Sequence, residues 1–231
     1  DLLVLAVVSD STETTRYELA VRAIDSTSFV TLALSAPTVF LLSRRLAAGE
    51  LPAAQRAFDV LVHTVTVIGV GLSALLGPLA TPLATFAYGA RYASSGRPLA
   101  VLGSFLWAAF LVAALGGLLT SSESPRKVVR LVALLPRFEA VGAAVATVGT
   151  QLVAVAVYAR VAARLTGVRT APPSPRIVLS GLLAATAAWA TRDATLAVPL
   201  ALGGTVYATG LLATGAVRRD DLTRLRALVA G

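Results

Sequence analysis

Six runs without a charged residue divide this chain, and short segments that carry arginine separate them. The runs span residues 26–43, 60–90, 98–122, 140–159, 177–191 and 194–217. Five of them hold 18 or more residues, the length of α-helix that crosses a hydrocarbon core of roughly 30 Å at about 1.5 Å per residue. A water-soluble domain does not carry five such stretches. The sequence therefore predicts an all-α fold, a polytopic transmembrane helix bundle.

Composition agrees with a membrane protein. It argues against a nucleic-acid-binding protein and against a protein with a thiolate or histidine-cluster metal site. Of the 231 residues, 56% are hydrophobic and 14% are charged. The net charge of +8 comes from arginines spread between apolar runs, rather than from one basic block with interleaved aromatic residues, so we expect membrane lipids and no nucleic acid as partners. The chain has no cysteine and one histidine, which excludes thiolate and histidine-cluster metal sites.

The arginines also predict how the helices are oriented, because cytoplasmic loops of membrane proteins are enriched in Lys and Arg. We place the C-terminal tail, residues 218–231, on the cytoplasmic side because it holds four arginines. Counting back one crossing at a time puts the loops at 160–176, 120–130 and 44–56 on the same side. The prediction is a multi-pass protein of the cytoplasmic membrane with its C-terminus inside.

One of the membrane crossings that this topology requires falls on a segment that is too short to span a bilayer. From Val128 to Pro136 there are nine residues, about 14 Å of helix or half a membrane. The segment is either a re-entrant half-helix or a place where residues are absent, near 130–134, and the charge alternation favours absent residues. The chain also opens at Asp1 directly into an apolar run, which is typical of the tail of a longer helix. We therefore expect a fragment whose N-terminal part is missing.

Prolines and small residues predict helix ends and helix contacts. Pro78 and Pro82 are expected to bracket the end of a helix over 57–80, and the proline-rich segment 172–175 to precede a helix that starts near Arg176. A helix over 140–159 carries small residues four apart, at positions 142, 146, 150 and 154. This small-xxx-small face predicts that other helices enclose it.

Polar residues inside spanning helices are costly, so they are the default candidates for a functional site. Glu18, Arg22 and Asp25 follow i, i+4, i+7 spacing on a helix predicted over 17–43, which places all three on one face. Either they line an aqueous cavity that meets a charged substrate, or they form a salt-bridge ladder at the outer end of the helix. Gln151 is a further candidate for the substrate cavity, although an amide in mid-membrane usually bonds to another helix.

Asp59 and His63 are also four residues apart, near the inner end of the helix predicted over 57–80. One interpretation is proton coupling through this pair, because histidine titrates near neutral pH. An interfacial Asp–His hydrogen bond is the favoured alternative. The sequence shows no catalytic triad, no phosphate-binding glycine loop and no carboxylate cluster for a metal. We therefore expect no enzyme activity, no metal and no cofactor.

Three segments carry a family resemblance. Residues 134–147, Leu-Leu-Pro-Arg-Phe-Glu-Ala-Val-Gly-Ala-Ala-Val-Ala-Thr, end one helix at a proline and begin the next with small residues. With residues 17–22 and 88–102, they resemble the oligosaccharide and polysaccharide flippases of the multidrug/oligosaccharidyl-lipid/polysaccharide exporter superfamily. Glu139 stands where that family's signature has glycine. Order and spacing are similar to the C-terminal half of such a transporter over nearly the whole chain.

The resemblance implies a two-lobed helical transporter. Residues 1–167 would be the second six-helix lobe, residues 168–217 two extra C-terminal helices, and residues 218–231 a cytoplasmic basic tail. The missing N-terminal lobe of the same chain would be the structural partner. The substrate would be a lipid-linked saccharide, flipped across the cytoplasmic membrane by alternating access for cell-surface polysaccharide synthesis.

In such a transporter Arg22 would hold a diphosphate, because guanidinium groups bind phosphate oxygens bidentately. Two alternatives stay open. The chain could belong to a cation-coupled multidrug antiporter of the same superfamily, or to a non-transporting membrane scaffold of a polysaccharide synthesis complex. A scaffold would keep Glu18, Arg22 and Asp25 paired and closed to water.

Overall fold

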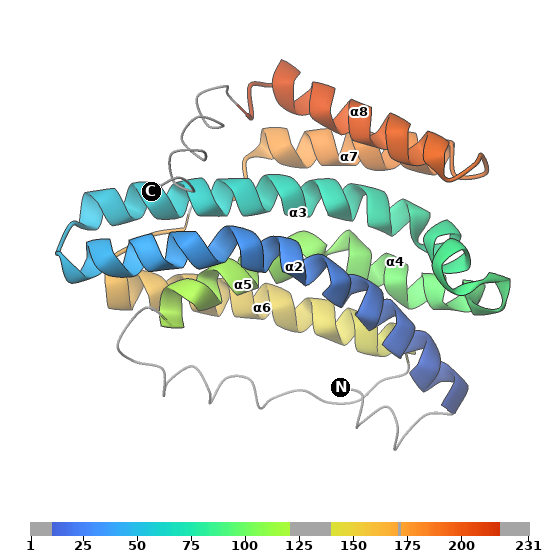
Figure 1. The fold of residues 1–231 in the computed structure, drawn as a ribbon, viewed down its shortest axis with the longest axis horizontal. Coiled ribbons are helices and arrows are strands. Elements are labelled where there is room, and N and C mark those ends of the chain that lie inside the picture. Colours follow the sequence, from blue (N-terminus) through green and yellow to red (C-terminus); the bar gives the residue numbers. More distant parts are fainter. Residues whose placement is uncertain (1–10, 121–139, 171, 218–231) are drawn as a thin grey trace.

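The computed structural model describes residues 11–120, 140–170 and 172–217, and every regular element in these ranges is a helix (Figure 1). The all-α class predicted from the sequence is confirmed for this part of the chain. The elements are α2 (Ser11–Ala47), α3 (Leu51–Tyr88), the 3-10 helix η1 (Ala90–Ser95), α4 (Gly96–Ser104), α5 (Leu106–Thr120), α6 (Ala140–Thr166), α7 (Pro175–Ala190) and α8 (Ala197–Ala213).

Helix α3 is the axis of the fold. Helices α2, α4 and α5 pack against it, α6 packs against α4 and α5, and the α7–α8 hairpin lies along the opposite side of α3 (Figure 1). The largest hydrophobic core joins the first half of α3 to the end of α2, to α5 and to the end of α6. Its fully buried members include Leu42, Phe58, Val65 and Leu115. This core joins α2 to both α3 and α5, and it joins α6 to α5.

Glycines allow α3 and its neighbours to approach closely. A Cβ atom added at Gly69 would lie 2.8 Å from the Cα atom of Trp107 on α5. One added at Gly96, the first residue of α4, would lie 2.6 Å from the Cα atom of Thr81 on α3. Small residues that let two helix backbones approach closely are common at contacts between membrane helices.

Helix α3 runs without interruption through Pro78 and Pro82 to Tyr88, so the prediction that these prolines mark its end is wrong. Each proline removes one backbone N–H and frees one carbonyl of the helix. Leu79 and Ala80, between them, are fully buried and hold this turn against its neighbours. Tertiary packing of this kind offsets part of the cost of a proline inside a helix.

The charge-free run 98–122, expected as one spanning helix, is broken instead. Helices α4 and α5 meet at Phe105, and the broken helix bends there by 51°. The Ser104 hydroxyl donates to the Ala100 carbonyl at 2.7 Å, and the Trp107 N–H on α5 donates to the Ser73 hydroxyl of α3 at 3.1 Å. A serine of α3 therefore satisfies one of the backbone N–H groups that the break leaves open.

Length and hydropathy single out few membrane spans among the described residues. Helix α3 alone is long and apolar enough to cross a membrane, and the bent pair of η1–α4 with α5 qualifies as a second span if taken together. Helices α7 and α8 are apolar but shorter, with 16 and 17 residues. The multi-span bundle remains a prediction, and the short crossing expected at 128–136 and the basic tail lie outside the described residues.

Candidate functional site

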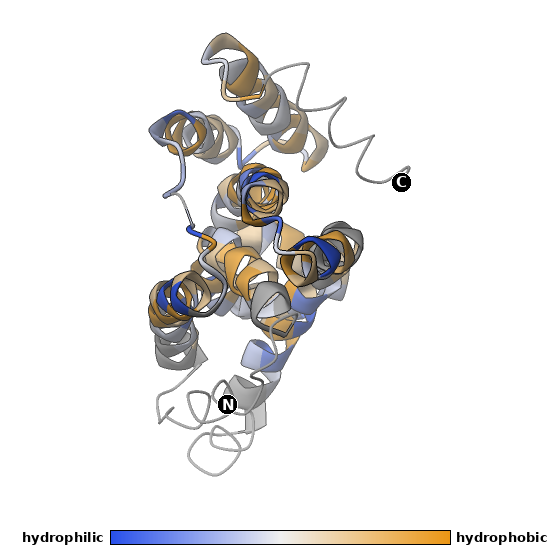
Figure 2. Cartoon of the chain, turned by 90° about the vertical axis from the view of Figure 1, so that its left-hand side faces the viewer, coloured by the Kyte–Doolittle hydropathy of each residue, from blue (hydrophilic) through white to orange (hydrophobic). Residues whose placement is uncertain are grey.

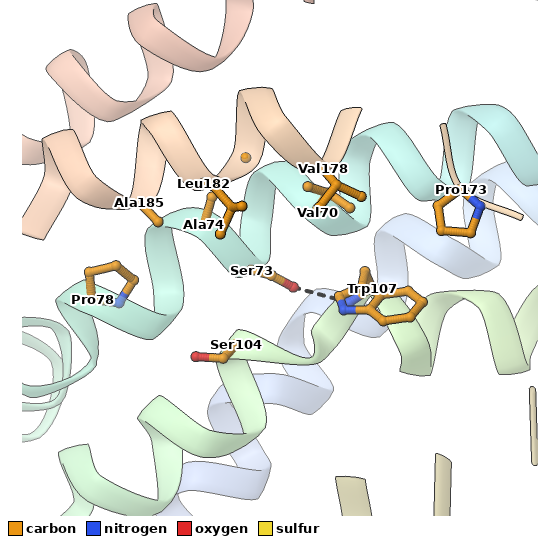
Figure 3. A pocket seen from close by; sticks show the side chains of 11 residues that line it. Val70, Ser73, Ala74, Pro78, Ser104, Trp107, Pro173, Val178, Leu182 and Ala185 are labelled. Carbon is orange, nitrogen blue, oxygen red and sulfur yellow. Dashed lines mark hydrogen bonds between the residues drawn. The ribbon is translucent and has the colours of Figure 1, made fainter. Parts of the chain in front are cut away.

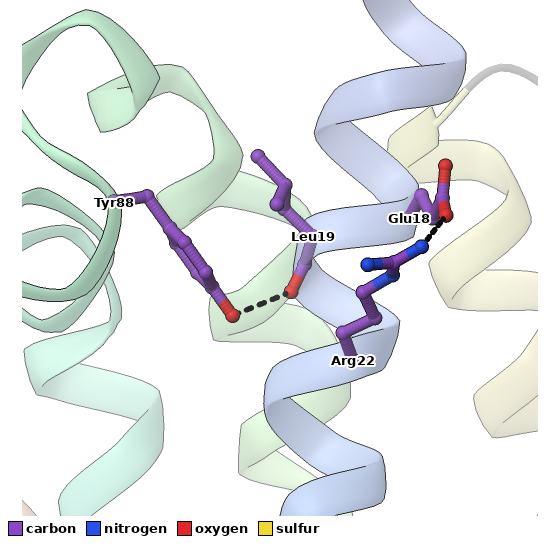
Figure 4. A network of polar contacts seen from close by, with 4 residues as sticks. All are labelled: Glu18, Leu19, Arg22 and Tyr88. Carbon is purple, nitrogen blue, oxygen red and sulfur yellow. Dashed lines mark hydrogen bonds and ion pairs between the residues drawn. The ribbon is translucent and has the colours of Figure 1, made fainter.

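The charged residues predicted on α2 lie together on one exposed face of that helix. Arg22 Nη2 donates to Glu18 Oε1 at 2.6 Å, and the two side chains are 70% and 38% exposed (Figure 4). Asp25 is exposed one turn further and forms no ion pair with another described residue. Tyr17 and Ala20 are buried on the other side of α2. Helix α2 is therefore two-faced: one side packs on the bundle, and the other carries the charges.

Two tyrosines hold the start of α2 in place beneath this face. The Tyr17 hydroxyl lies 3.1 Å from the Thr147 hydroxyl of α6, and the Tyr88 hydroxyl at the end of α3 donates to the Leu19 carbonyl at 3.4 Å (Figure 4). The second contact is long and weak, but it comes from the opposite side of α2. Sequence reasoning did not single out either tyrosine for this role.

Gln151 lies on α6, one turn after Thr147, and is half-buried. Its amide makes no hydrogen bond to another residue that the structure describes, so the expected cross-helix partner is not seen within these ranges. Through the Tyr17–Thr147 contact the structure brings the helix of Gln151 against the start of α2. It does not place Gln151 in contact with the ion pair of Glu18 and Arg22.

The hydrogen bond expected between Asp59 and His63 is not formed. Asp59 Oδ1 instead accepts a hydrogen bond from Gln55 Nε2 at 2.7 Å, because Gln55 also lies four residues away, on the preceding turn. Asp59 is exposed, whereas His63 Nε2 is buried and has no hydrogen-bond partner among the described residues. Proton coupling between the two side chains would therefore need an intervening group.

Gln55 is a residue that sequence reasoning missed. Its Oε1 accepts from the Arg169 backbone N–H at 2.8 Å, and its Nε2 donates to the Arg169 carbonyl at 2.8 Å. This two-way contact fixes the connector between α6 and α7 onto the first turns of α3. The sequence did show a glutamine one turn before Asp59. Its partner Arg169 is 114 residues away in the chain, so this contact could be identified only from the folded structure.

A cavity of about 360 Å³ opens where α7 runs past the break between α4 and α5 (Figure 3). Apolar side chains supply most of its wall, with two serines on the side of α3 and α4. The lining residues are Val70, Ser73, Ala74, Pro78, Ser104, Trp107, Pro173, Val178, Gly181, Leu182 and Ala185. We refer to this cavity as the α3–α7 pocket.

The α3–α7 pocket is chemically a hydrocarbon site. Its lining contains no charged side chain. Each of the two serine hydroxyls makes one hydrogen bond: that of Ser73 accepts from the Trp107 backbone N–H, and that of Ser104 donates to the Ala100 carbonyl. Polar ligand atoms buried against this wall would lose their hydration and gain few partners, because the wall offers only the remaining sites of two serine hydroxyls and the indole N–H of Trp107. Within the described ranges, no group of three or more His, Asp or Glu side chains could hold a metal ion.

Comparison of the chain with family models, with curated protein sequences and with solved structures gave no match. The family resemblance therefore rests on the sequence segments themselves. Its most specific segment, residues 134–147, lies partly outside the described residues.

Proposed function

We propose that this chain is part of a multi-span membrane transporter that flips a lipid-linked saccharide across the cytoplasmic membrane by alternating access. The observation that carries the proposal is the charged face of α2. Glu18, Arg22 and Asp25 stay exposed on a helix whose other face packs into an apolar bundle. Charges beside spanning helices are expensive unless water or an ionic ligand lies next to them.

The membrane setting is supported by where apolar and polar residues lie. Large apolar side chains, among them Leu179, Leu183 and Leu212, are exposed on the outer sides of α7 and α8. Hydrophilic residues gather at the ends of α2, α3 and α6 that face the viewer in Figure 2. Exposed leucines along helix sides, with polar residues at helix ends, suit a bilayer better than water.

The chemistry of Arg22 suits an anionic head group. A guanidinium group has five N–H donors, and among the described residues Arg22 uses its Nη2 on Glu18 alone. The remaining donors are free to form paired hydrogen bonds with the oxygens of a diphosphate. Glu18 would keep the arginine paired while the site is empty and would release it when a phosphate binds.

A lipid-flipping assay in proteoliposomes tests this proposal. The complete protein is reconstituted with a fluorescent polyprenyl-diphosphate saccharide, and flipping is followed by reduction of the dye in the outer leaflet. Arg22→Ala should slow flipping about tenfold or more, since a charge-assisted hydrogen bond contributes about 1.5–3 kcal/mol. Arg22→Lys should restore it only in part, because an ammonium lacks the guanidinium fork. Arg192→Ala, an exposed arginine on the α7–α8 loop, is the matched control.

Normal flipping by Arg22→Ala would contradict the proposed role.

One observation favours a second candidate, the cation-coupled antiporter: the Asp25 carboxylate is exposed without an ion-pair partner among the described residues, and a transported cation could bind it. In that case Asp25→Asn should abolish cation-driven drug uptake, while Arg22→Ala leaves it in place. A scaffold would show neither activity.

A further inference from the structure

Six arginines gather at the end of the bundle where α2 ends, α3 begins and α6 ends, on the left in Figure 1. One of them, Arg45, forms an ion pair with Glu50 at 3.3 Å. The other five are exposed and form no ion pair with another residue that the structure describes. We refer to these five as the basic end: Arg44, Arg56, Arg160, Arg164 and Arg169.

Contacts between the helices bring the basic end together from segments that are far apart in the sequence. The Gln55 side chain, in the second turn of α3, makes two hydrogen bonds of 2.8 Å with the backbone of Arg169. Leu42 of α2, Ala54 of α3 and Val168, just beyond α6, are fully buried in the same core. The end of α2, the start of α3 and the end of α6 therefore lie at the same end of the bundle.

Carboxylates offset only part of this positive charge. Among the described residues, this end of the bundle has six arginines but two carboxylates, Glu50 and Asp59. At the opposite end, Arg192 lies 3.8 Å from the carboxylate of Asp193, and the charged face of α2 holds a carboxylate on each side of its arginine. The two ends of the bundle therefore differ in charge, and the basic end is the one that attracts anions.

Exposed apolar side chains precede the arginines on the same helices. On α2, Phe40 is 66% exposed, and the Arg44 guanidinium lies 6.0 Å from the centre of its ring. On α6, Val153 is 61% exposed, and Arg160 follows seven residues later on the same side of the helix. This order suits a membrane interface, because the stem of an arginine lies along apolar surface while its guanidinium reaches the head groups.

We propose that the basic end binds the head groups of anionic phospholipids in the leaflet where α2 and α6 end. Guanidinium groups pair with the head-group phosphates, and the uncancelled charge favours lipids with a net negative head group over zwitterionic ones. The acyl chains of these lipids lie against Phe40 and Val153. This surface is separate from the charged face of α2, and it rests on the proposed function only in requiring that the helices lie in a bilayer.

Two single-tryptophan variants of the complete protein test this surface, because the chain has only Trp107 and Trp189. The first combines Trp107→Phe and Trp189→Phe with Phe40→Trp, which reports on lipid beside Arg44. The second carries Trp107→Phe alone and keeps Trp189, which is 57% exposed at the opposite end of the bundle. Each is reconstituted in phosphatidylcholine, and phosphatidylglycerol or phosphatidylcholine with brominated acyl chains is titrated in as a quencher.

The two reporters should respond differently to the charge of the lipid. The tryptophan at position 40 should be half-quenched at an about fivefold lower mole fraction of brominated phosphatidylglycerol than of brominated phosphatidylcholine, since one arginine near the surface contributes about that factor for an anionic lipid. Trp189 should be quenched equally by the two lipids, because the neighbouring Arg192 is paired with Asp193.

Substitutions at Arg44 separate its charge from its shape. Arg44→Gln should remove most of the preference for phosphatidylglycerol at position 40, whereas Arg44→Lys should keep it, because an ammonium also attracts an anionic head group. Arg192→Gln, which removes an exposed arginine at the opposite end, is the matched control and should leave the preference at position 40 unchanged.

Four results would overturn the proposal. They are equal quenching by the two lipids at position 40, an equal preference at position 40 and at Trp189, equal effects of Arg44→Gln and Arg192→Gln, and loss of the preference in millimolar inorganic phosphate but not in KCl of the same ionic strength. The last would assign the arginines to a free anion. Flipping without a lipid preference at position 40 would sink this surface alone, whereas the preference without flipping would sink the transport proposal alone.

Discussion

The bundle around the first half of α3 and the α7–α8 hairpin are held together in different ways. The bundle has a continuous core drawn from α2, α3, α5 and α6, with fully buried residues as large as Phe58 and Phe110. The hairpin core consists of Ile177, Leu211 and Ala216, with a few partly buried neighbours. The first region is stabilised by large interlocking side chains, whereas the second depends on close contact and a few polar bonds.

Small residues make that close contact. A Cβ atom added at Gly71 of α3 would lie 2.6 Å from the Tyr207 ring of α8, and one added at Gly210 would lie 2.9 Å from the Ser180 hydroxyl of α7. The Tyr207 hydroxyl donates to the Val67 carbonyl at 2.5 Å. The hairpin is thus attached to α3 in a way that a single side chain can disturb.

The largest effect is expected in the bundle. Phe58→Ala should lower the free energy of unfolding by about 3–5 kcal/mol, because it empties a fully buried aromatic position. Unfolding of the purified protein in mixed micelles of rising SDS fraction measures this. Phe86→Ala, on the same helix but 80% exposed, should change the free energy by less than about 0.5 kcal/mol. Similar losses in both variants would contradict the position of this core.

A substitution at Gly71 should separate the hairpin from the bundle. Gly71→Val places atoms where the Tyr207 ring now lies, and overpacking of this kind costs about 1–3 kcal/mol. Limited trypsin digestion in detergent should then cut faster at Arg169, in the connector, or at Arg176, in the first turn of α7. Gly204→Val is the control and should leave the digestion rate unchanged, because a Cβ atom added at Gly204 has no neighbouring atom within 4 Å. An unchanged cleavage rate in Gly71→Val would mean that the hairpin does not depend on this contact.

The smallest effect is expected from one hydroxyl group. Tyr207→Phe removes the hydrogen bond to the Val67 carbonyl, and such interhelical bonds contribute about 0.6 kcal/mol, rarely more than about 1.7 kcal/mol. The same SDS titration measures the change. Tyr158→Phe provides the comparison, because the Tyr158 hydroxyl makes no hydrogen bond to another described residue. A loss above about 2 kcal/mol would show that the hydroxyl supports more than this single contact.

The sequence predicted the helices better than their ends. Five of the six charge-free runs each lie on one described helix, while the run 98–122 is divided between α4 and α5. Pro78 and Pro82 were misleading, since neighbouring side chains, which no local pattern reveals, allow α3 to continue past them. The break at Phe105 did have a local signal. The preceding Gly103–Ser104 pair is a common site of sharp bends in helices.

Only the part of the site that depends on residue spacing along a single helix could be predicted from the sequence. Spacing along one helix was enough to place Glu18, Arg22 and Asp25 on a common face. The same reasoning failed for Asp59, where Gln55 satisfied the spacing rule equally well and took the hydrogen bond. The α3–α7 pocket could not be predicted from the sequence. Its wall combines residues from Val70 to Ala185, which come together only when α7 packs on α3.

Cysteine accessibility in native membranes tests the central claim, that the α2 face meets water while the outer side of α7 meets lipid. The chain has no cysteine, so each single substitution reports one position. Ser26→Cys, next to Asp25 on the exposed face of α2, should react readily with a membrane-impermeant maleimide. Leu183→Cys, also exposed in the structure but on α7, should not react until detergent is added. Equal labelling of both positions in intact membranes, or labelling of Leu183→Cys alone, would contradict the account.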